Sequence, residues 1–351
     1  MSNSPLRLEQ YDTILYNANL NPMGVPESVV KAITENASQV SRYPVDYYGN
    51  LKQAIGTYCG CDSNHIIMAN GSSDMLRTFI SLIAPQKAMV LVPSSPEYES
   101  ILEIYGTGVE YYQLKEEEGY EFRLSDFVAG LDSSLDMIII GNPNNPTSRL
   151  ISREDMETLA DVCKELDIFL VIDETYIEFA ENYEQITCVP LVKEYNNIVI
   201  FRSVSRFFSV PGMCFAYAIM NNPDYMSVLD ITTPADKIST LTAIACTRMV
   251  KDTEYIYASR SQIFTERNLI YSAMSTCRNL RLYKPYANFM LARILKKDIF
   301  ARDIADACKL KGLIIKTCED FRGLDNTYIR FCFMNPKDND VLVNTILEQL
   351  K

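Results

Sequence analysis

The chain has 351 residues, of which 48% are hydrophobic and 22% are charged, so it can bury sizeable cores and lacks the composition of a disordered protein. Its 33 Lys and Arg residues are outnumbered by 45 Asp and Glu residues, and the formal net charge is -12 at pH 7. This charge argues against nucleic acid and anionic membranes as partners, whereas a few well-placed cations or N–H groups still suffice for one small anion. At about 150 residues per domain, the length predicts roughly two lobes.

Cysteine and histidine usage argues against a metal site. Ten cysteines are spread from Cys59 to Cys332, and the one close pair, Cys59 and Cys61, has no second pair to complete a set of ligands. We expect reduced thiols and no bound metal. The single histidine, His65, is better explained as a strand-edge residue than as a catalytic one. No apolar run approaches the ~20 residues that cross a bilayer, and the N-terminus lacks an apolar signal core, so we expect a cytoplasmic protein.

The first two thirds of the chain alternate short apolar runs with helical patterns. The runs are KAMVLVP (87–93), LDMIIIGNP (135–143), IFLVIDETY (168–176) and NNIVIFRS (196–203). Between two of them, residues 152–166 place Met156, Leu159 and Cys163 on one helical stripe, after a Ser152 that is suited to cap the helix. This alternation is typical of βαβ units, and it predicts an α/β fold with a mostly parallel sheet buried on both faces.

The pattern changes after about residue 215. Helical segments are expected at 236–252 and 255–274. Short strands are then expected within 280–294, 312–320 and 326–334, with helices at 300–311 and 338–351. This mixture predicts a smaller α+β C-terminal lobe.

Three short motifs follow apolar strands. They are ANGSSD (69–74), GNPNNPTS (141–148) and VIDETYIEF (171–179). Taken singly, each has an ordinary explanation: a Gly-Ser turn into a helix, a Pro/Asn turn, and an acid that caps the next helix.

Together, in this order and spacing, the motifs resemble those of the fold-type I pyridoxal-phosphate aminotransferases. The resemblance is strongest to the histidinol-phosphate aminotransferase branch and its relative, threonine-phosphate decarboxylase. It runs from LYNANLNPMGVPESVVKAI (15–33) and SRYPVDYYGNLKQAI (41–55) to ANFMLARI (287–294) and TYIRFCF (327–333). It implies a three-layer α/β/α aminotransferase fold, with an N-terminal arm (1–35), a large cofactor-type domain (36–265), a small C-terminal domain (266–351) and a homodimer.

The resemblance also implies a site for the cofactor ring. Asp173 matches the carboxylate that keeps the pyridine nitrogen protonated, which lets the ring act as an electron sink. Tyr176 and Asn145 match the two groups that hydrogen-bond the ring 3-oxygen. Tyr98 resembles the aromatic side chain that stacks on the ring.

The remaining implied roles concern the cofactor phosphate and the substrate. Ser72, Ser73 and Ser205 match phosphate ligands, and Tyr43 resembles a tyrosine that is supplied across the dimer interface. For the substrate, Arg330 matches the arginine that forks onto the carboxylate, Lys316 stands where relatives often carry a second arginine, and Asn21 of the arm is expected to contribute.

The chain departs from the family at 205–217, which reads SRFFSVPGMCFAY. Arg206 replaces the Schiff-base lysine, Cys214 replaces a phosphate-binding arginine, and Ala216 replaces a glycine. A guanidinium stays protonated, so Arg206 supplies neither a free amine nor a base near neutral pH, and losing general acid/base action costs about 10²–10⁴ in rate. The change at Cys214 removes a charge-assisted contact worth on the order of 1.5–3 kcal/mol.

Lys237 offers a relocated amine, since its segment passes near the active site in relatives. An exposed lysine that precedes a helix is the favoured explanation of this residue.

Three functional hypotheses follow. The first is an aminotransferase-like protein that binds pyridoxal or pyridoxamine phosphate non-covalently, with an amino acid or amino-acid phosphate as its second ligand and little turnover. The second is a non-catalytic ligand-binding or partner subunit, a pseudoenzyme. The third is an amino-acid-phosphate decarboxylase, a lyase that the loss of lysine would impair equally.

Overall fold

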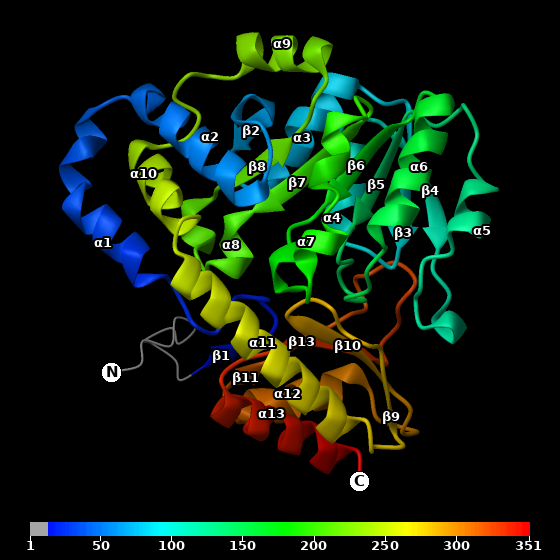
Figure 1. The fold of residues 1–351 in the computed structure, drawn as a ribbon. Coiled ribbons are helices and arrows are strands. Elements are labelled where there is room, and N and C mark those ends of the chain that lie inside the picture. The colour runs from blue at the N-terminus through cyan, green and yellow to red at the C-terminus, as the bar shows by residue number, and fades with distance from the viewer. Residues whose placement is uncertain (1–12) are drawn as a thin grey trace.

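The computed structural model describes residues 13–351, with the side chains of residues 45–47 left out. A seven-stranded sheet with helices on both faces forms the larger part, and a four-stranded sheet lies beside it (Figure 1). This arrangement confirms the predicted three-layer α/β fold with a smaller α+β lobe. In residues 13–351, no helix is long and apolar enough to cross a membrane, and no group of three or more His, Cys, Asp or Glu side chains could hold a metal ion.

The large sheet has the order β2-β8-β7-β6-β5-β3-β4. Its strands are β2 (Ile66–Ala69), β3 (Lys87–Val92), β4 (Gly108–Gln113), β5 (Met137–Gly141), β6 (Phe169–Asp173), β7 (Ile198–Ser203) and β8 (Ala216–Ile219). Only β8 runs antiparallel to its neighbours in this sheet. Three of the four apolar runs singled out in the sequence became the adjacent central strands β5, β6 and β7, and the fourth became β3.

Alternation along the central strands divides the core between the two faces. Ile138 and Ile140 of β5 pack into one buried cluster, whereas Met137 and Ile139 pack into a second cluster. Both faces are therefore apolar, as a sheet covered by helices requires.

The helices divide between the same two clusters. One face carries α3 (Ser72–Ile83), α4 (Pro96–Ile104) and α9 (Pro223–Thr232), and the other carries α2 (Val45–Cys59), α6 (Arg153–Glu165), α10 (Thr240–Met249) and the first part of α11 (Thr253–Met274). The other helices of the larger part are α1 (Glu27–Glu35), α5 (Leu124–Val128), α7 (Tyr183–Ile186) and α8 (Val204–Phe207).

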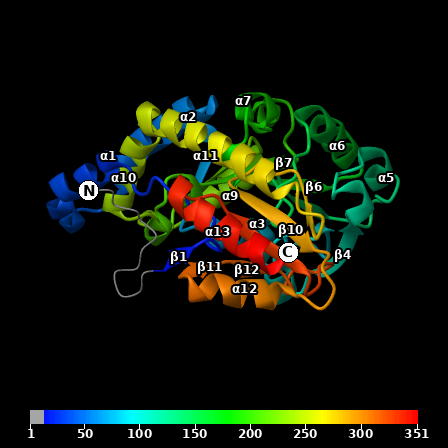
Figure 2. The same ribbon diagram turned by 90° about the horizontal axis from the view of Figure 1, so that it is seen from below.

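The smaller lobe has the sheet order β12-β13-β10-β9. Its strands are β9 (Leu280–Leu282), β10 (Phe289–Ile294), β12 (Lys316–Thr317) and β13 (Tyr328–Cys332), and α12 (Ala301–Leu310) and α13 (Pro336–Gln349) lie along it, as the view from below shows (Figure 2). The arm strand β1 (Ile14–Leu15) pairs with β11 (Leu313–Ile314). The arm is thereby fixed to the C-terminal lobe.

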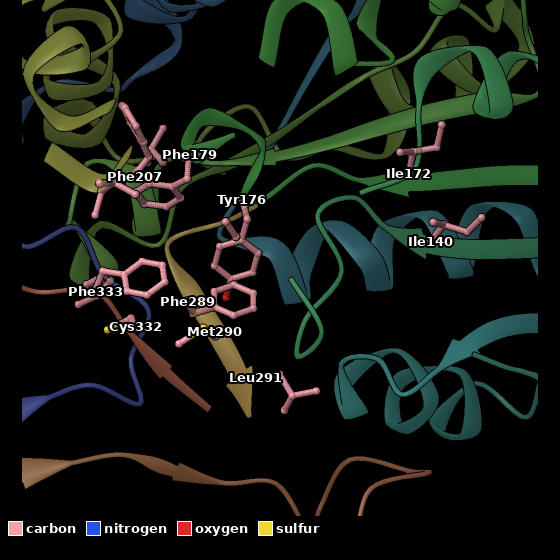
Figure 3. Close-up of a cluster of buried hydrophobic side chains, with 14 of the residues drawn as sticks. Ile140, Ile172, Tyr176, Phe179, Phe207, Phe289, Met290, Leu291, Cys332 and Phe333 are labelled. Atoms are coloured by element: carbon pink, nitrogen blue, oxygen red, sulfur yellow. The ribbon is translucent and has the colours of Figure 1, made fainter. Parts of the chain in front are cut away.

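Aromatic packing joins the two parts of the molecule. The Tyr176 ring, which follows β6, meets Phe289 of β10 edge to face, with centroids 4.9 Å apart (Figure 3). Both side chains belong to a single buried cluster that reaches Phe207 of α8 and Phe333 beyond β13. The loop that follows β6 is therefore held between both sheets.

A buried ion-pair network braces the same loop. Arg202 of β7 is 2% exposed, and it pairs with Glu174 and Glu178 at 2.8 Å each. It also donates to Thr187, which itself donates to Glu174. Burial raises the pKa of Glu178, and the Arg202 charge opposes that shift. The guanidinium thus ties β7 to the chain that directly follows Asp173.

We predict that Arg202→Met lowers the free energy of unfolding by about 3–5 kcal/mol, because it leaves two buried carboxylates without their cation. Urea denaturation at pH 7 measures the loss. The matched control is Arg322→Met, which breaks an exposed pair with Glu99 and should cost far less. Equal losses in the two variants would contradict the role assigned to Arg202.

Candidate active site

A pocket lies at the carboxyl ends of the central parallel strands. Gly141, Asp173 and Phe201 are neighbours in the register of β5, β6 and β7, so the residues that follow these strands meet at one edge of the sheet. The pocket has a volume of about 290 Å³. It is lined by Asn70, Gly71, Ser72, Ser73, Ser95, Glu97, Tyr98, Pro143, Asn145, Asp173, Thr175, Tyr176, Ser203, Ser205, Arg206, Pro211 and Cys214.

Asp173, at the end of β6, is one of two acids that line this pocket. One carboxylate oxygen accepts a hydrogen bond from the Tyr98 phenol at 2.7 Å, and the other accepts from the backbone N–H and the hydroxyl of Thr175 at 3.0 and 2.5 Å. Burial, followed by the Asp173 charge, raises the pKa of Tyr98 well above its ordinary value, so this phenol remains a donor. The Asp173 carboxylate is therefore fixed in position by protein groups alone.

Asn145 links the pocket to the small lobe. Its side-chain oxygen accepts from Arg330 Nη1 at 2.5 Å, while Arg330 Nη2 donates to the Asn17 carbonyl of the arm at 2.8 Å. Arg330 is 6% exposed, and its Nε has no hydrogen-bond partner. A buried donor without a partner costs free energy, so the Arg330 fork is suited to an incoming acceptor such as a carboxylate.

The first turn of α3 lines a further part of the pocket, the α3 end. Gly71 has φ +91°, which favours glycine, and Ser72 and Ser73 open the helix. The N–H groups of a first helical turn have no partner within the helix and attract anions. Glu97 of α4 reaches the same end and accepts a hydrogen bond from the Ser73 hydroxyl. Glu97 was not predicted as a site residue, because an acid in the first turn of a helix is already explained by the helix dipole.

Arg206 lies in the pocket wall on the short helix α8. Its Nη1 donates to the Ala18 carbonyl at 2.7 Å, and its own carbonyl accepts from the Asn21 backbone N–H at 3.1 Å. Arg206 and Arg330 therefore hold the consecutive carbonyls of Asn17 and Ala18. Ser205, which precedes Arg206, also lines the pocket.

Five residues considered in the sequence do not line the pocket, and Arg330, which contacts the pocket residue Asn145, is one of them. Lys316 pairs with Asp320 at 2.7 Å, and Tyr43 is 78% exposed outside the pocket of its own chain. Asn21 is fully buried, and its amide donates to the Phe207 carbonyl and to Ser259 at 2.7 and 2.8 Å. Lys237 pairs with Asp74 at 3.0 Å, so its ammonium faces α3 and does not line the pocket.

The pocket lies at the carboxyl ends of the parallel strands of a three-layer α/β fold, and its lining contains an acid from the central strand β6 and the N-terminus of a helix. This arrangement defines a small-molecule binding protein or enzyme. The family model for aminotransferase class I and II matches residues 11–346. The chain belongs to the class I and II aminotransferase family.

Individual relatives agree with this assignment. Threonine-phosphate decarboxylase of Salmonella typhimurium is 28% identical over 329 residues, which cover 93% of this chain and 88% of that protein. The histidinol-phosphate aminotransferase structure from Clostridium acetobutylicum superposes with a TM-score of 0.88 at 28% identity, covering 95% of this chain and 98% of that one. The Sinorhizobium meliloti histidinol-phosphate aminotransferase, solved in complex with pyridoxal-5'-phosphate, gives 0.85 at 20% identity, covering 96% and 90%.

Cys214 supplies a direct chemical test of the pocket. All ten cysteines lie in the described part of the chain and are free, and Cys214 alone among them is exposed. Burial raises the pKa of Cys59 and Cys61 to about 12 and about 11, which slows their reaction as thiolates.

We predict that a maleimide modifies Cys214 before the other thiols, and that a ligand filling the pocket slows this reaction. Peptide mass mapping over a time course measures the order of labelling. Cys214→Ser should remove the fast phase. An unchanged fast phase in that variant would show that another thiol is the accessible one.

Proposed function

We propose that this chain binds pyridoxal or pyridoxamine 5'-phosphate without a covalent bond, together with an amino acid or amino-acid phosphate. The observation that carries the proposal is the convergence of Asp173, Tyr176, Asn145 and Tyr98 on one pocket that ends at the first turn of α3. When bound, this cofactor supplies an electron sink for chemistry at an amino-acid carbon.

The ring end of the pocket fits the cofactor. The Asp173 carboxylate is a suitable partner for a protonated ring nitrogen, and Thr175 already holds it in place. A ring that bonds to Asp173 would displace the Tyr98 hydroxyl, which occupies one carboxylate oxygen, and Tyr98 would then be free to pack on the ring face. Tyr176 and Asn145 line the same wall and carry the hydroxyl and amide that a ring oxygen needs.

The substrate end is expected at Arg330. Its unpartnered Nε and its fork geometry suit a carboxylate, and its contact with Asn145 connects substrate binding to the ring end of the pocket. Lys316 and Asn21 remain candidates from the sequence. Their present hydrogen bonds to Asp320 and to Phe207 and Ser259 would have to break first.

Arg206 decides what chemistry is left. Its guanidinium holds no free amine that could bond an aldehyde, and it does not take up a proton near neutral pH. Lys237 is held in an ion pair with Asp74 and supplies no substitute in the pocket. The chain is therefore expected to bind its ligands with little or no transamination.

Two alternative functions are also supported by specific observations. Arg206 and Cys214 favour a non-catalytic ligand-binding or partner subunit, because the first offers no amine for a covalent bond and the second no cation for a phosphate. Similarity to threonine-phosphate decarboxylase supports a lyase, which needs the same amine. Tyr43, exposed and outside its own pocket, is available to a second subunit, so a homodimer belongs to the proposal, as does a cytoplasmic location.

We predict that Arg206→Lys gains a covalent bond to pyridoxal 5'-phosphate. The substitution places an amine on α8 that can bond the aldehyde, and borohydride reduction followed by intact-mass analysis and peptide mapping would locate the adduct at residue 206. The wild-type chain and Lys237→Arg serve as controls, and neither is expected to form an adduct in the pocket. An adduct in the wild-type pocket would contradict the proposal.

A further inference from the structure

Glu97 is an acidic residue of the pocket lining to which no role in ligand binding has been given. It is half-buried in the first turn of α4, directly before Tyr98. Its carboxylate accepts a hydrogen bond from the Ser73 hydroxyl at the α3 end of the pocket. It therefore stands among the same hydroxyl and N–H groups that would receive an anionic group of a ligand.

No cation compensates this carboxylate. In residues 13–351, no lysine or arginine forms a salt bridge with Glu97, although Asp74 on the same turn of α3 is paired with Lys237. Arg206 is directed to the Ala18 carbonyl of the arm. Cys214, which also lines the pocket, is not a cationic residue, and its thiol lies 3.6 Å from the Pro211 carbonyl.

A phosphate group brings about 1.5–2 negative charges at pH 7 and seeks N–H, hydroxyl and cationic partners. Here it would meet the N–H groups of α3, the hydroxyls of Ser72, Ser73 and Ser205, and one unpaired carboxylate. Like charges brought together in a pocket are strongly unfavourable, so the phosphate would have to displace Glu97 from Ser73.

We infer that Glu97 is a specificity-determining residue that disfavours a phosphate dianion at the α3 end of the pocket. The inference rests on the proposed function and narrows its ligand class. The chain gains little affinity from the phosphate of a pyridoxal-type ligand. It binds the unphosphorylated ring compound nearly as tightly, and the same holds for a compound with a neutral or singly charged group at that position.

The test compares pyridoxamine 5'-phosphate with pyridoxamine, which differ only in the phosphate and have no aldehyde to react with surface lysines. Calorimetric titration gives the ratio of their dissociation constants in each full-length variant. Glu97→Gln removes the charge, and Cys214→Arg adds a cation by an independent route. Glu103→Gln, an exposed acid on the same helix, is the matched control, and thermal unfolding checks that each variant is folded.

We expect the wild-type chain to prefer the phosphorylated compound by less than about tenfold, and both Glu97→Gln and Cys214→Arg to increase this preference by about tenfold or more, while Glu103→Gln leaves it unchanged. If both compounds bind the wild-type chain and Glu97→Gln leaves the ratio within about twofold, the inference is wrong while the proposed function stands. If neither compound binds any variant, the proposed function is wrong, and this inference falls with it.

Discussion

Parallel pairing of β5, β6 and β7 is the constraint on which the pocket depends. The register that sets Gly141, Asp173 and Phe201 side by side brings the Pro/Asn turn, the acidic loop and the α8 segment to one edge of the sheet. Asn145 and Asp173 are 28 residues apart in sequence and Asp173 and Arg206 are 33 apart, and only the shared strand direction makes them neighbours. The buried Arg202 network and the Tyr176–Phe289 contact then hold the loop after β6 against both lobes. The Asp173 carboxylate is consequently placed before any ligand arrives, which reduces the cost of ordering the site on binding.

The two ends of the pocket differ in the groups that surround their carboxylates. At the ring end, the partly buried Asp173 carboxylate accepts hydrogen bonds from Tyr98 and Thr175, so both of its oxygens are satisfied. At the α3 end, the N–H groups of the helix lie beside the Glu97 carboxylate, which accepts a hydrogen bond from the Ser73 hydroxyl. Arg206 holds the arm by the Ala18 carbonyl. Under the proposed function, the chain keeps the residues that would recognise a ring and alters those that would form the covalent bond and hold the phosphate.

Much of this could be predicted from the sequence, because strands, turns and a family pattern are local signals. The apolar runs became the central strands, and Asp173, Tyr176, Asn145, Tyr98, Ser72, Ser73 and Ser205 all line one pocket. What could not be predicted depends on side-chain direction. Lys316 faces Arg330 in the strand register but turns to Asp320, and Asn21 is occupied by Phe207 and Ser259. Glu97 could not be predicted as a specificity residue, because this role depends on the lack of a salt bridge to its carboxylate in the described residues, which no spacing in the sequence reveals.

We propose above that a pyridoxal-type ring binds against Asp173 with no covalent bond to the chain. The decisive test is a crystal structure of the wild-type protein grown with pyridoxamine 5'-phosphate. We expect the ring nitrogen within hydrogen-bonding distance of the Asp173 carboxylate, the Tyr98 hydroxyl released from Asp173, and Glu97 moved away from Ser73. A ligand bound elsewhere, or a pocket in which the Tyr98–Asp173 hydrogen bond persists at saturating ligand, would contradict it.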